Sequence, residues 1–511
     1  MNFYRDYLMV NKLVAAFDRF FGEPVDSRSL NLFRALYCGM LVCTHLPQMS
    51  RAESLYKSYF SVYFPTPLFE WLGLGQLPLS VVRLSGVLLL IALLSAACGL
   101  FTRLALTLAW ISFFLFYGTV LGFEKPEPHA ISLYTYHYNN IVLFVLFILS
   151  VSPGVSLWGI DGLRRRGWGW QSRSASPPAV LSVPAWPTRL IKLILALAYF
   201  GSGATKLKTS GILWADGYTL QAYFLMKHLE EEAWAGYWIA QYYWVCVALS
   251  ACTLILELTF IVVPFLSNRH PLMWFYVAAG LGLHIAIAVT MKIIHFLPFM
   301  GLTYLIFLDW PIFARLIGLV YPRPVREQES PGSMRVWDCF SMSSNEKGWP
   351  WQIRFSRYFI VGLLSILIFC IVFHVEVWPF SDYGVFRRRS HYRRVKVGQI
   401  RGIDRENNIH WLRAQDLGDG FNGWYDGTNF ERFYVAHIKQ TSVNMPSWEG
   451  FIRNEAFMRV GPDLLRDFHQ HLPSPLREQL PTLEFVIRSV RRGADGWLVP
   501  SDTVLISTKM Q

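Results

Sequence analysis

Residues 199–220 have the sequence Tyr199-Phe-Gly-Ser-Gly-Ala-Thr-Lys206-Leu-Lys-Thr-Ser-Gly-Ile-Leu-Trp214-Ala-Asp-Gly217-Tyr-Thr-Leu220. They begin as the end of an apolar helix, residues 190–204, and continue through a loop broken by glycines. Lys206 lies where the apolar run stops. One interpretation is an anchor whose long side chain reaches the lipid headgroups. The other is a desolvated amine that gives up its proton and acts as a base. Polar residues elsewhere in the chain favour the second interpretation.

The composition indicates a protein that crosses a membrane several times. Of its 511 residues, 53% are hydrophobic and 16% aromatic, more than soluble domains carry, and several apolar runs approach the length of a bilayer span. The net charge of +12 suits an anionic inner leaflet. No motif for nucleic-acid binding accompanies that charge. The seven cysteines show no metal-site spacing. We therefore expect a lipid bilayer as partner, with no nucleic acid and no metal.

The apolar runs divide the chain into three regions. Residues 1–28 place apolar side chains at helical spacing around basic residues, which predicts an amphipathic segment at the membrane interface. Residues 29–378 hold the apolar runs and predict an all-α membrane bundle of about nine transmembrane helices. The expected spans are residues 30–46, 79–100, 103–121, 131–151, 190–204, 238–266, 274–290, 293–312 and 358–377.

Residues 379–511 have a different pattern, which predicts a small C-terminal α+β domain outside the membrane. Two β-rich segments flank the turn-forming run Asp404-Arg-Glu-Asn-Asn408 and predict a hairpin. The expected strands are residues 395–400, 409–412, 483–490 and 503–507, and the expected helix is residues 451–472.

The charges of the loops predict the orientation. Basic residues gather in the loops after the fourth, sixth and eighth spans, whereas the loop after the fifth span carries Glu230-Glu-Glu232. The positive-inside rule then gives a cytoplasmic N-terminus and an outer C-terminal domain in a multi-pass membrane protein. A basic cluster at residues 387–396 favours the opposite side, although long C-terminal domains cross the membrane largely regardless of charge.

This topology places five titratable side chains at a similar depth. His137 lies about six residues, roughly 9 Å, inside the outer end of the fourth span. Lys206 is at the outer end of the fifth. His284 lies about six residues before the outer end of the seventh span, and Lys292 and His295 follow in the next turn. Because polar groups within a membrane tend to face an interior cavity, we expect a site in the outer half of the membrane.

Several short motifs occur in order along residues 20–310. They are Asp26-Ser-Arg-Ser-Leu30 with Phe33-Arg34, Gly99-Leu-Phe-Thr-Arg103, His137, Trp158-Gly-Ile-Asp161-Gly-Leu163, Tyr199-Phe with Lys206-Leu and Trp214-Ala-Asp-Gly217-Tyr218, and His284. In these motifs the chain resembles the vitamin K-dependent γ-carboxylase family and its bacterial relatives, grouped as the horizontally transferred transmembrane (HTTM) domain. The Lys-Leu element with its Trp-x-x-Gly is the most specific of them.

The resemblance implies an enzyme that oxidises a quinol, either vitamin K hydroquinone or menaquinol, to its epoxide. By this resemblance Lys206 deprotonates the quinol and His137 stabilises the oxyanion that forms. In the family, oxygen then gives an alkoxide that abstracts a γ-proton of glutamate, and CO₂ captures the carbanion. The remaining candidates for the quinol pocket are Trp214, Gly217, His284, Lys292 and His295.

Two departures from the family leave carboxylation and any protein substrate open. Residues 285–289 are apolar where the carboxylases have polar residues. About 130 residues without clear similarity replace the large lumenal region that holds glutamate-rich substrates. The alternative function is that of a non-carboxylating maturation factor for exported proteins, because lipase maturation factors have a comparable multi-span core followed by a β-rich domain. An exported protein or peptide is then a further expected partner, beside the quinone. The resemblance to the bacterial relatives also implies a bacterial inner membrane as the location.

Overall fold

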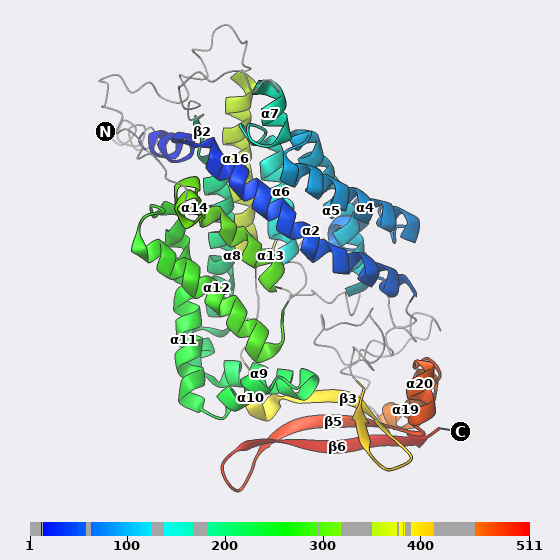
Figure 1. The fold of residues 1–511 in the computed structure, drawn as a ribbon. Coiled ribbons are helices and arrows are strands. Elements are labelled where there is room, and N and C mark those ends of the chain that lie inside the picture. Colours follow the sequence, from blue (N-terminus) through cyan, green and yellow to red (C-terminus); the bar gives the residue numbers. More distant parts are fainter. Residues whose placement is uncertain are drawn as a thin grey trace.

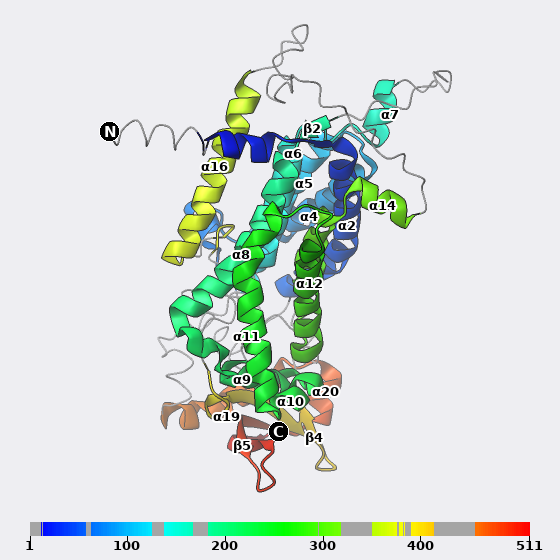
Figure 2. The ribbon, with the colours of Figure 1, turned by 90° about the vertical axis from the view of Figure 1, so that its left-hand side faces the viewer.

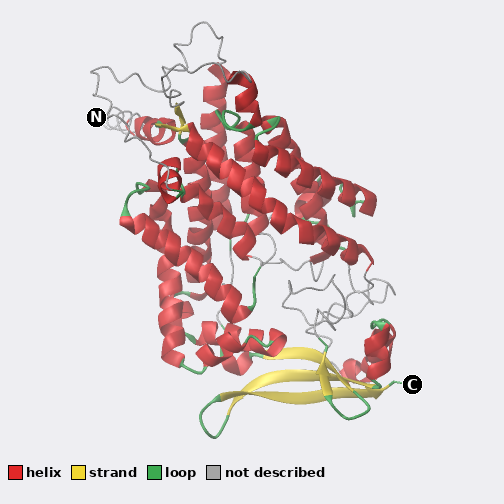
Figure 3. Cartoon of the chain, viewed as in Figure 1, coloured by secondary structure: helices red, strands yellow, loops and turns green. Residues whose placement is uncertain are grey.

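The computed structural model describes residues 12, 14–57, 63–124, 137–166, 182–294, 296–317, 350–375, 378–381, 383, 390–412 and 455–510. In this part of the chain a bundle of helices stands on a small β-sheet, and the sheet lies at one end of the bundle (Figures 1 and 3). Figure 2 shows the same arrangement from the side, with β2 (Ser182–Pro184) and α7 (Ile160–Arg166) at the end opposite the sheet.

Six helical segments of the described chain are long and apolar enough to cross a membrane. They are α4 (Leu79–Cys98), α5 (Thr102–Glu124), α8 (Trp186–Ser210), α11 (Tyr243–Thr259) continued by η2 (Phe260–Phe265), α12 (Pro271–Met291) and α16 (Pro350–Phe373). They overlap the second, third, fifth, sixth, seventh and ninth predicted spans. The chain is a multi-pass membrane protein by this criterion, as its composition predicts.

Nine spans are not confirmed, because three predicted spans differ from this pattern. The first lies within α2 (Ser27–Lys57), a helix of 31 residues whose buried polar residues include Arg34. Of the fourth, the described part is α6 (His137–Val151), which has 15 residues, and residues 131–136 of the predicted span lie outside the described residues. The eighth bends by 100° between residues 297–307 and 310–316, and counting this bent pair as one span gives at most seven.

The bend in the eighth predicted span has a local cause. Residues 296–307 form α13 (Phe296–Thr303) and η3 (Tyr304–Phe307), and a new helix, α14, begins at Trp310. Asp309 caps α14 by accepting a hydrogen bond from the Ile312 amide at 3.0 Å, and Pro311 follows in the first turn. A cap and a proline at this place start a helix in a new direction.

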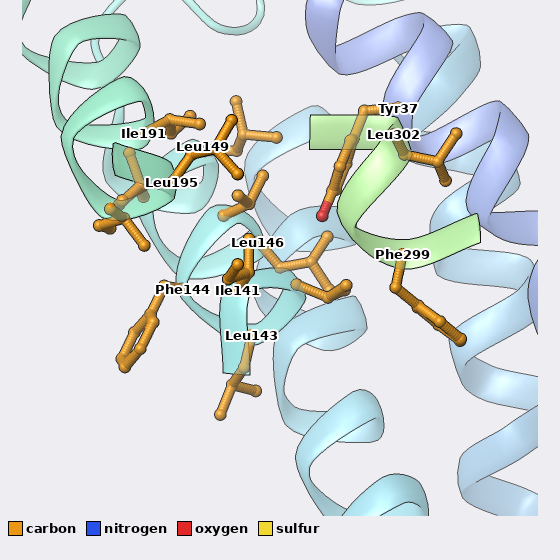
Figure 4. Packing of buried hydrophobic residues seen from close by; sticks show 14 of the residues in the cluster. Tyr37, Ile141, Leu143, Phe144, Leu146, Leu149, Ile191, Leu195, Phe299 and Leu302 are labelled. Atoms are coloured by element: carbon orange, nitrogen blue, oxygen red, sulfur yellow. The ribbon is translucent and has the colours of Figure 1, made fainter. Parts of the chain in front are cut away.

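The core of the bundle surrounds α6. This helix packs against α5, α8 and α13, and Figure 4 shows its side chains between those of α2, α8 and α13. The labelled residues are Ile141, Leu143, Phe144, Leu146 and Leu149 of α6, Tyr37 of α2, Ile191 and Leu195 of α8, and Phe299 and Leu302 of α13. Beyond its first turn this helix is apolar on nearly every side, as is typical of a helix enclosed by its neighbours.

The C-terminal region forms a four-stranded antiparallel sheet in the order β4-β3-β5-β6. The strands are β3 (Lys396–Ile403), β4 (Ile409–Trp411), β5 (Thr482–Arg492) and β6 (Leu498–Lys509), accompanied by α19 (Glu455–Gln470) and α20 (Ser474–Gln479). The predicted hairpin is confirmed. Its turn is closed by Asp404, whose Oδ1 accepts from the Asn408 amide at 2.8 Å, while Asn407 adopts a left-handed conformation at φ 66°.

Two short helices join the sheet to the bundle. They are α9 (Tyr218–Glu231) and α10 (Trp234–Ala240), which follow α8 and lie across the end of the bundle (Figure 1). Arg488 of β5 donates to the Leu229 carbonyl at 2.8 Å. The Gln241 side chain exchanges two hydrogen bonds with the backbone of Leu498, at 3.0 and 2.8 Å. The sheet is therefore fixed at the end of the bundle where α8 ends.

Candidate functional site

Lys206 lies inside the protein, on the last turns of α8. Its side chain is 2% exposed, and its Nζ donates to both carboxylate oxygens of Glu257, at 2.7 and 2.9 Å. It also donates to Ser202 Oγ at 2.7 Å, and this hydroxyl donates to Glu257 Oε1 at 3.1 Å. The ammonium is held by protein groups and does not reach the lipid headgroups. The structure thus contradicts the interpretation of Lys206 as a lipid anchor.

The sequence of α8 explains this geometry. Ser202 and Lys206 are four residues apart and share one face of the helix. Gly203, beside them, lets α8 and α11 approach closely, because a Cβ atom added there would lie 3.1 Å from Glu257 Cβ and 3.0 Å from Leu258 Cγ. Small residues at a crossing bring helix backbones together in membranes. The glycine therefore places the α11 carboxylate within reach of the lysine.

Trp214 and Gly217 complete the surroundings of Lys206. Trp214 belongs to the 3₁₀ helix η1 (Ile212–Asp216), is 3% exposed, and has its ring centroid 5.1 Å from Lys206 Nζ. A ring at this distance attracts the cation. Gly217 has a φ of 83°, and an added Cβ would lie 2.7 Å from the Val247 amide nitrogen of α11. Only glycine permits this close approach, which folds η1 back over the lysine.

A second polar group lies farther back on α8. The Tyr199 hydroxyl is 2.8 Å from His284 Nε2 and 2.5 Å from the Tyr304 hydroxyl, and it donates to the Gly280 carbonyl at 3.1 Å. The three ring-bearing side chains are buried. Phe260, one turn beyond Glu257, stacks on the Tyr199 ring at 4.2 Å between centroids. Tyr199 and Lys206 are seven residues apart, about 10 Å along the helix, so both groups follow the contact between α8 and the α11–η2 segment.

The other predicted site residues have different positions. Lys292 is exposed, ends α12 at φ 55°, and donates to the Glu231 carbonyl at 2.5 Å. This left-handed residue turns its side chain toward α9, so the structure does not bring it into the Lys206 cluster. His137 is the first residue of α6, and its side chain lies outside the described part of the structure. His295 also lies outside the described residues.

Sequence reasoning missed Glu257, the partner of Lys206. A signal was present, because Glu257 is the only charged residue among residues 243–266, an otherwise apolar run. An ionisable residue within a span is a functional candidate by default. Tyr199 was noted only as part of a motif and Tyr304 was missed. Neither gives a comparable signal, since a tyrosine in an apolar run is equally typical of a packed core.

The buried pair has a defined chemical capacity. Burial penalises both the ammonium and the carboxylate, while their mutual attraction and the Ser202 hydrogen bond favour the charged forms. Transfer of one proton from Nζ to Glu257, along a hydrogen bond of 2.7 Å, gives a neutral amine and a neutral acid. The neutral pair is closer in free energy to the charged pair here than it would be in water. Lys206 and Glu257 can therefore hold and pass a proton.

Comparison with protein-family models matches residues 22–310 to the HTTM domain. These residues contain both polar groups, from Tyr199 to Tyr304, and they exclude the C-terminal sheet. Separate searches of curated proteins and of solved structures gave no significant match.

Proposed function

The chain belongs to the HTTM domain family, and from this premise we propose that it binds a quinol and removes a proton from it with Lys206. The substrate would be vitamin K hydroquinone or menaquinol. The observation that carries the proposal is the contact of 2.7 Å between the buried Lys206 Nζ and Glu257. A general base has to exist without its proton, and Glu257 is an internal acceptor for that proton.

The proposed step has three parts. The Lys206 ammonium passes a proton to Glu257 and becomes an amine, which Ser202 keeps oriented through its hydroxyl. The amine then takes the proton of the quinol hydroxyl, giving a quinolate beside a new ammonium. His137, at the start of α6, would donate a hydrogen bond to the quinolate oxygen. Donors already in place at a developing negative charge are an effective means of lowering a barrier.

Oxidation of the quinolate by oxygen to the epoxide is the reaction that we expect to follow, with the chain acting on the pattern of the γ-carboxylases. Carboxylation of a glutamate substrate is a second half-reaction, in which the alkoxide formed from the quinolate and oxygen would abstract the γ-proton and CO₂ would capture the carbanion. The two can be measured separately, because epoxide forms on the quinone and γ-carboxyglutamate on the peptide.

Lys206→Arg tests the base. Arginine keeps the positive charge and the pairing with Glu257, but its guanidinium stays protonated at any pH at which the protein is folded. Oxygen-dependent conversion of each quinol to its epoxide, in nanodiscs, should fall by about 10²- to 10⁴-fold. The control is Lys208→Arg, since Lys208 is exposed and, within the described part of the chain, donates to the Val372 carbonyl and pairs with no carboxylate. Unchanged turnover in a stable Lys206→Arg protein would rule out the base.

The alternative proposal, a maturation factor for exported proteins, is favoured by a different observation. A β-sheet domain follows the helical core and is fixed to its end through α9, α10 and the hairpin of β5 and β6. Such a domain offers strands and loops for contact with a polypeptide. If wild-type protein forms no epoxide from either quinol, this alternative takes precedence, and release of active enzyme from a co-expressed exported client becomes the assay.

A further inference from the structure

A cavity of about 730 Å³ lies at the end of the bundle opposite the sheet. Its walls come from residues 16–29, the first turns of α8, the turn between η2 and α12, and the region around the start of α14. Figure 1 shows β2 and α14 at this end of the bundle. Lys192 lines it and is 14 residues before Lys206 on the same helix, about 21 Å away. The cavity is therefore separate from the Lys206 cluster and has no part in the proposed proton transfer.

Charged side chains of both signs line this cavity. They are Arg19, Glu23, Asp26, Arg189, Lys192 and Asp309. Two of the acids already have cationic partners, since Glu23 forms an ion pair with Arg189 and Asp26 forms one with Arg28 at 2.6 Å. These pairs leave Arg19, Lys192 and Asp309 to set the charge of the cavity, which is then +1.

Lys192 is the buried cation of this set. It is 8% exposed, its Nζ donates to Asn268 Oδ1 at 2.7 Å, and the Phe307 ring centroid lies 5.0 Å away. Asn268 in turn donates to Asp309 at 3.2 Å. Among the described residues no carboxylate forms an ion pair with Lys192. An ammonium has three N–H donors, so donors remain for a ligand in the cavity.

Arg19 and the apolar wall define the ligand further. Arg19 is exposed and forms no ion pair within the described part of the chain. Phe20, Phe265 and Leu266 line the same cavity, and Phe265 is 63% exposed. Phe275, on the adjoining span α12, is also exposed. A surplus positive charge beside an apolar surface that continues along a span fits an amphiphile with one negative charge.

We infer that this cavity binds the phosphodiester headgroup of a membrane phospholipid. Lys192 and Arg19 would contact the phosphate oxygens, because cations with free N–H groups form strong hydrogen bonds to such anions. The acyl chains would follow the exposed apolar residues of η2 and α12. A free phosphate ion shares the headgroup chemistry but gains nothing from this apolar surface, so the two ligands can be distinguished.

Native mass spectrometry of the delipidated full chain, titrated with phosphatidylglycerol, tests the inference. We expect Lys192→Gln and Arg19→Gln each to weaken binding about tenfold, as the loss of a hydrogen bond to a charged group predicts. Arg269→Gln is the matched control, because Arg269 is an exposed cation in the turn between η2 and α12 and does not line the cavity. Its binding should equal that of the wild type.

Two further ligands show whether the cavity binds a phospholipid headgroup or a free phosphate ion. Diacylglycerol, which lacks the phosphate, should not compete with phosphatidylglycerol, and inorganic phosphate should compete only at far higher concentration. Equal competition by inorganic phosphate would overturn the assignment to a lipid. Wild-type binding by Arg19→Gln would overturn the cavity as the site, and this variant keeps the test decisive if Lys192→Gln fails to fold, since Arg19 is exposed.

Discussion

Lys206 and Glu257 have a structural role that can be measured without any substrate. Glu257→Gln keeps the shape of the side chain but leaves the ammonium buried without its counter-charge. Removing one partner of a buried pair typically costs about 3–5 kcal/mol, whereas replacing both with apolar residues is often neutral or stabilising. We therefore expect a clear loss of thermal stability in Glu257→Gln, and its recovery in the double variant Lys206→Met with Glu257→Leu.

The same two variants report on the proposed base. Both should lack epoxide formation, the first because the proton acceptor is gone and the second because the amine is gone. A double variant that regained activity together with stability would contradict the proposed role of Lys206. If the double variant is as unstable as Glu257→Gln, the loss of stability does not come from an unpaired buried charge, and apolar side chains do not fit these two positions.

At the scale of single residues, the sequence draws attention to Lys206 but not to Glu257, the residue that pairs with it. The run from Lys206 to Gly217 can be recognised in the sequence, because an intramembrane lysine and a glycine-broken loop are local signals, and the structure places the Trp214 ring 5.1 Å from Lys206 Nζ. Glu257 comes from another helix, 51 residues away. Its pairing depends on the close crossing that Gly203 allows, and no local pattern encodes which helices cross.

At the scale of elements, the periodicity of apolar residues predicts strands and long spans well. It fails for α2 and for the bent segment around Asp309, each for a physical reason. α2 carries buried polar residues that contact other parts of the bundle, as when Arg34 donates to the Val155 carbonyl at 2.7 Å. The apolar run at residues 293–312 contains Asp309, which caps a new helix, and apolar periodicity does not detect such a cap.

The attachment of the sheet to the bundle depends on Gln241. Gln241→Ala removes both hydrogen bonds to Leu498, at a cost of about 1–3 kcal/mol to this contact. We expect faster amide hydrogen exchange in β6 near Leu498 and in the adjoining end of β5, with the transmembrane helices unchanged. Gln479→Ala, an exposed glutamine of α20, is the control. Unchanged exchange in Gln241→Ala would mean that Arg488 and the other contacts with α9 hold the sheet by themselves.

At the scale of the whole molecule, the connections between helices at the two ends of the bundle differ in charge. The short helix α7 (Ile160–Arg166) lies at the end opposite the sheet and carries Arg164, Arg165 and Arg166. At the sheet end the connection after α8 carries Glu230, Glu231 and Glu232. The C-terminal region at this end also carries Arg393, Arg394 and Lys396, but long C-terminal domains cross the membrane largely regardless of charge. From these charges the positive-inside rule predicts α7 in the cytoplasm and the sheet outside. Because Lys206 lies near the sheet end of α8, we then expect its cluster in the outer half of the membrane.

Labelling from one side of the membrane tests this orientation. Leu163 of α7 is 61% exposed and Asp495 in the β5–β6 turn is exposed, so both accept a cysteine without loss of packing. In a background without the native cysteines, a membrane-impermeant maleimide added to intact spheroplasts should label Asp495→Cys and spare Leu163→Cys. Both should react after permeabilisation. The reverse pattern would place the Lys206 cluster in the inner half, where a quinol and an exported substrate could not meet. Labelling of both positions in intact spheroplasts would mean that no membrane separates the two ends, and the bundle would not span it as proposed.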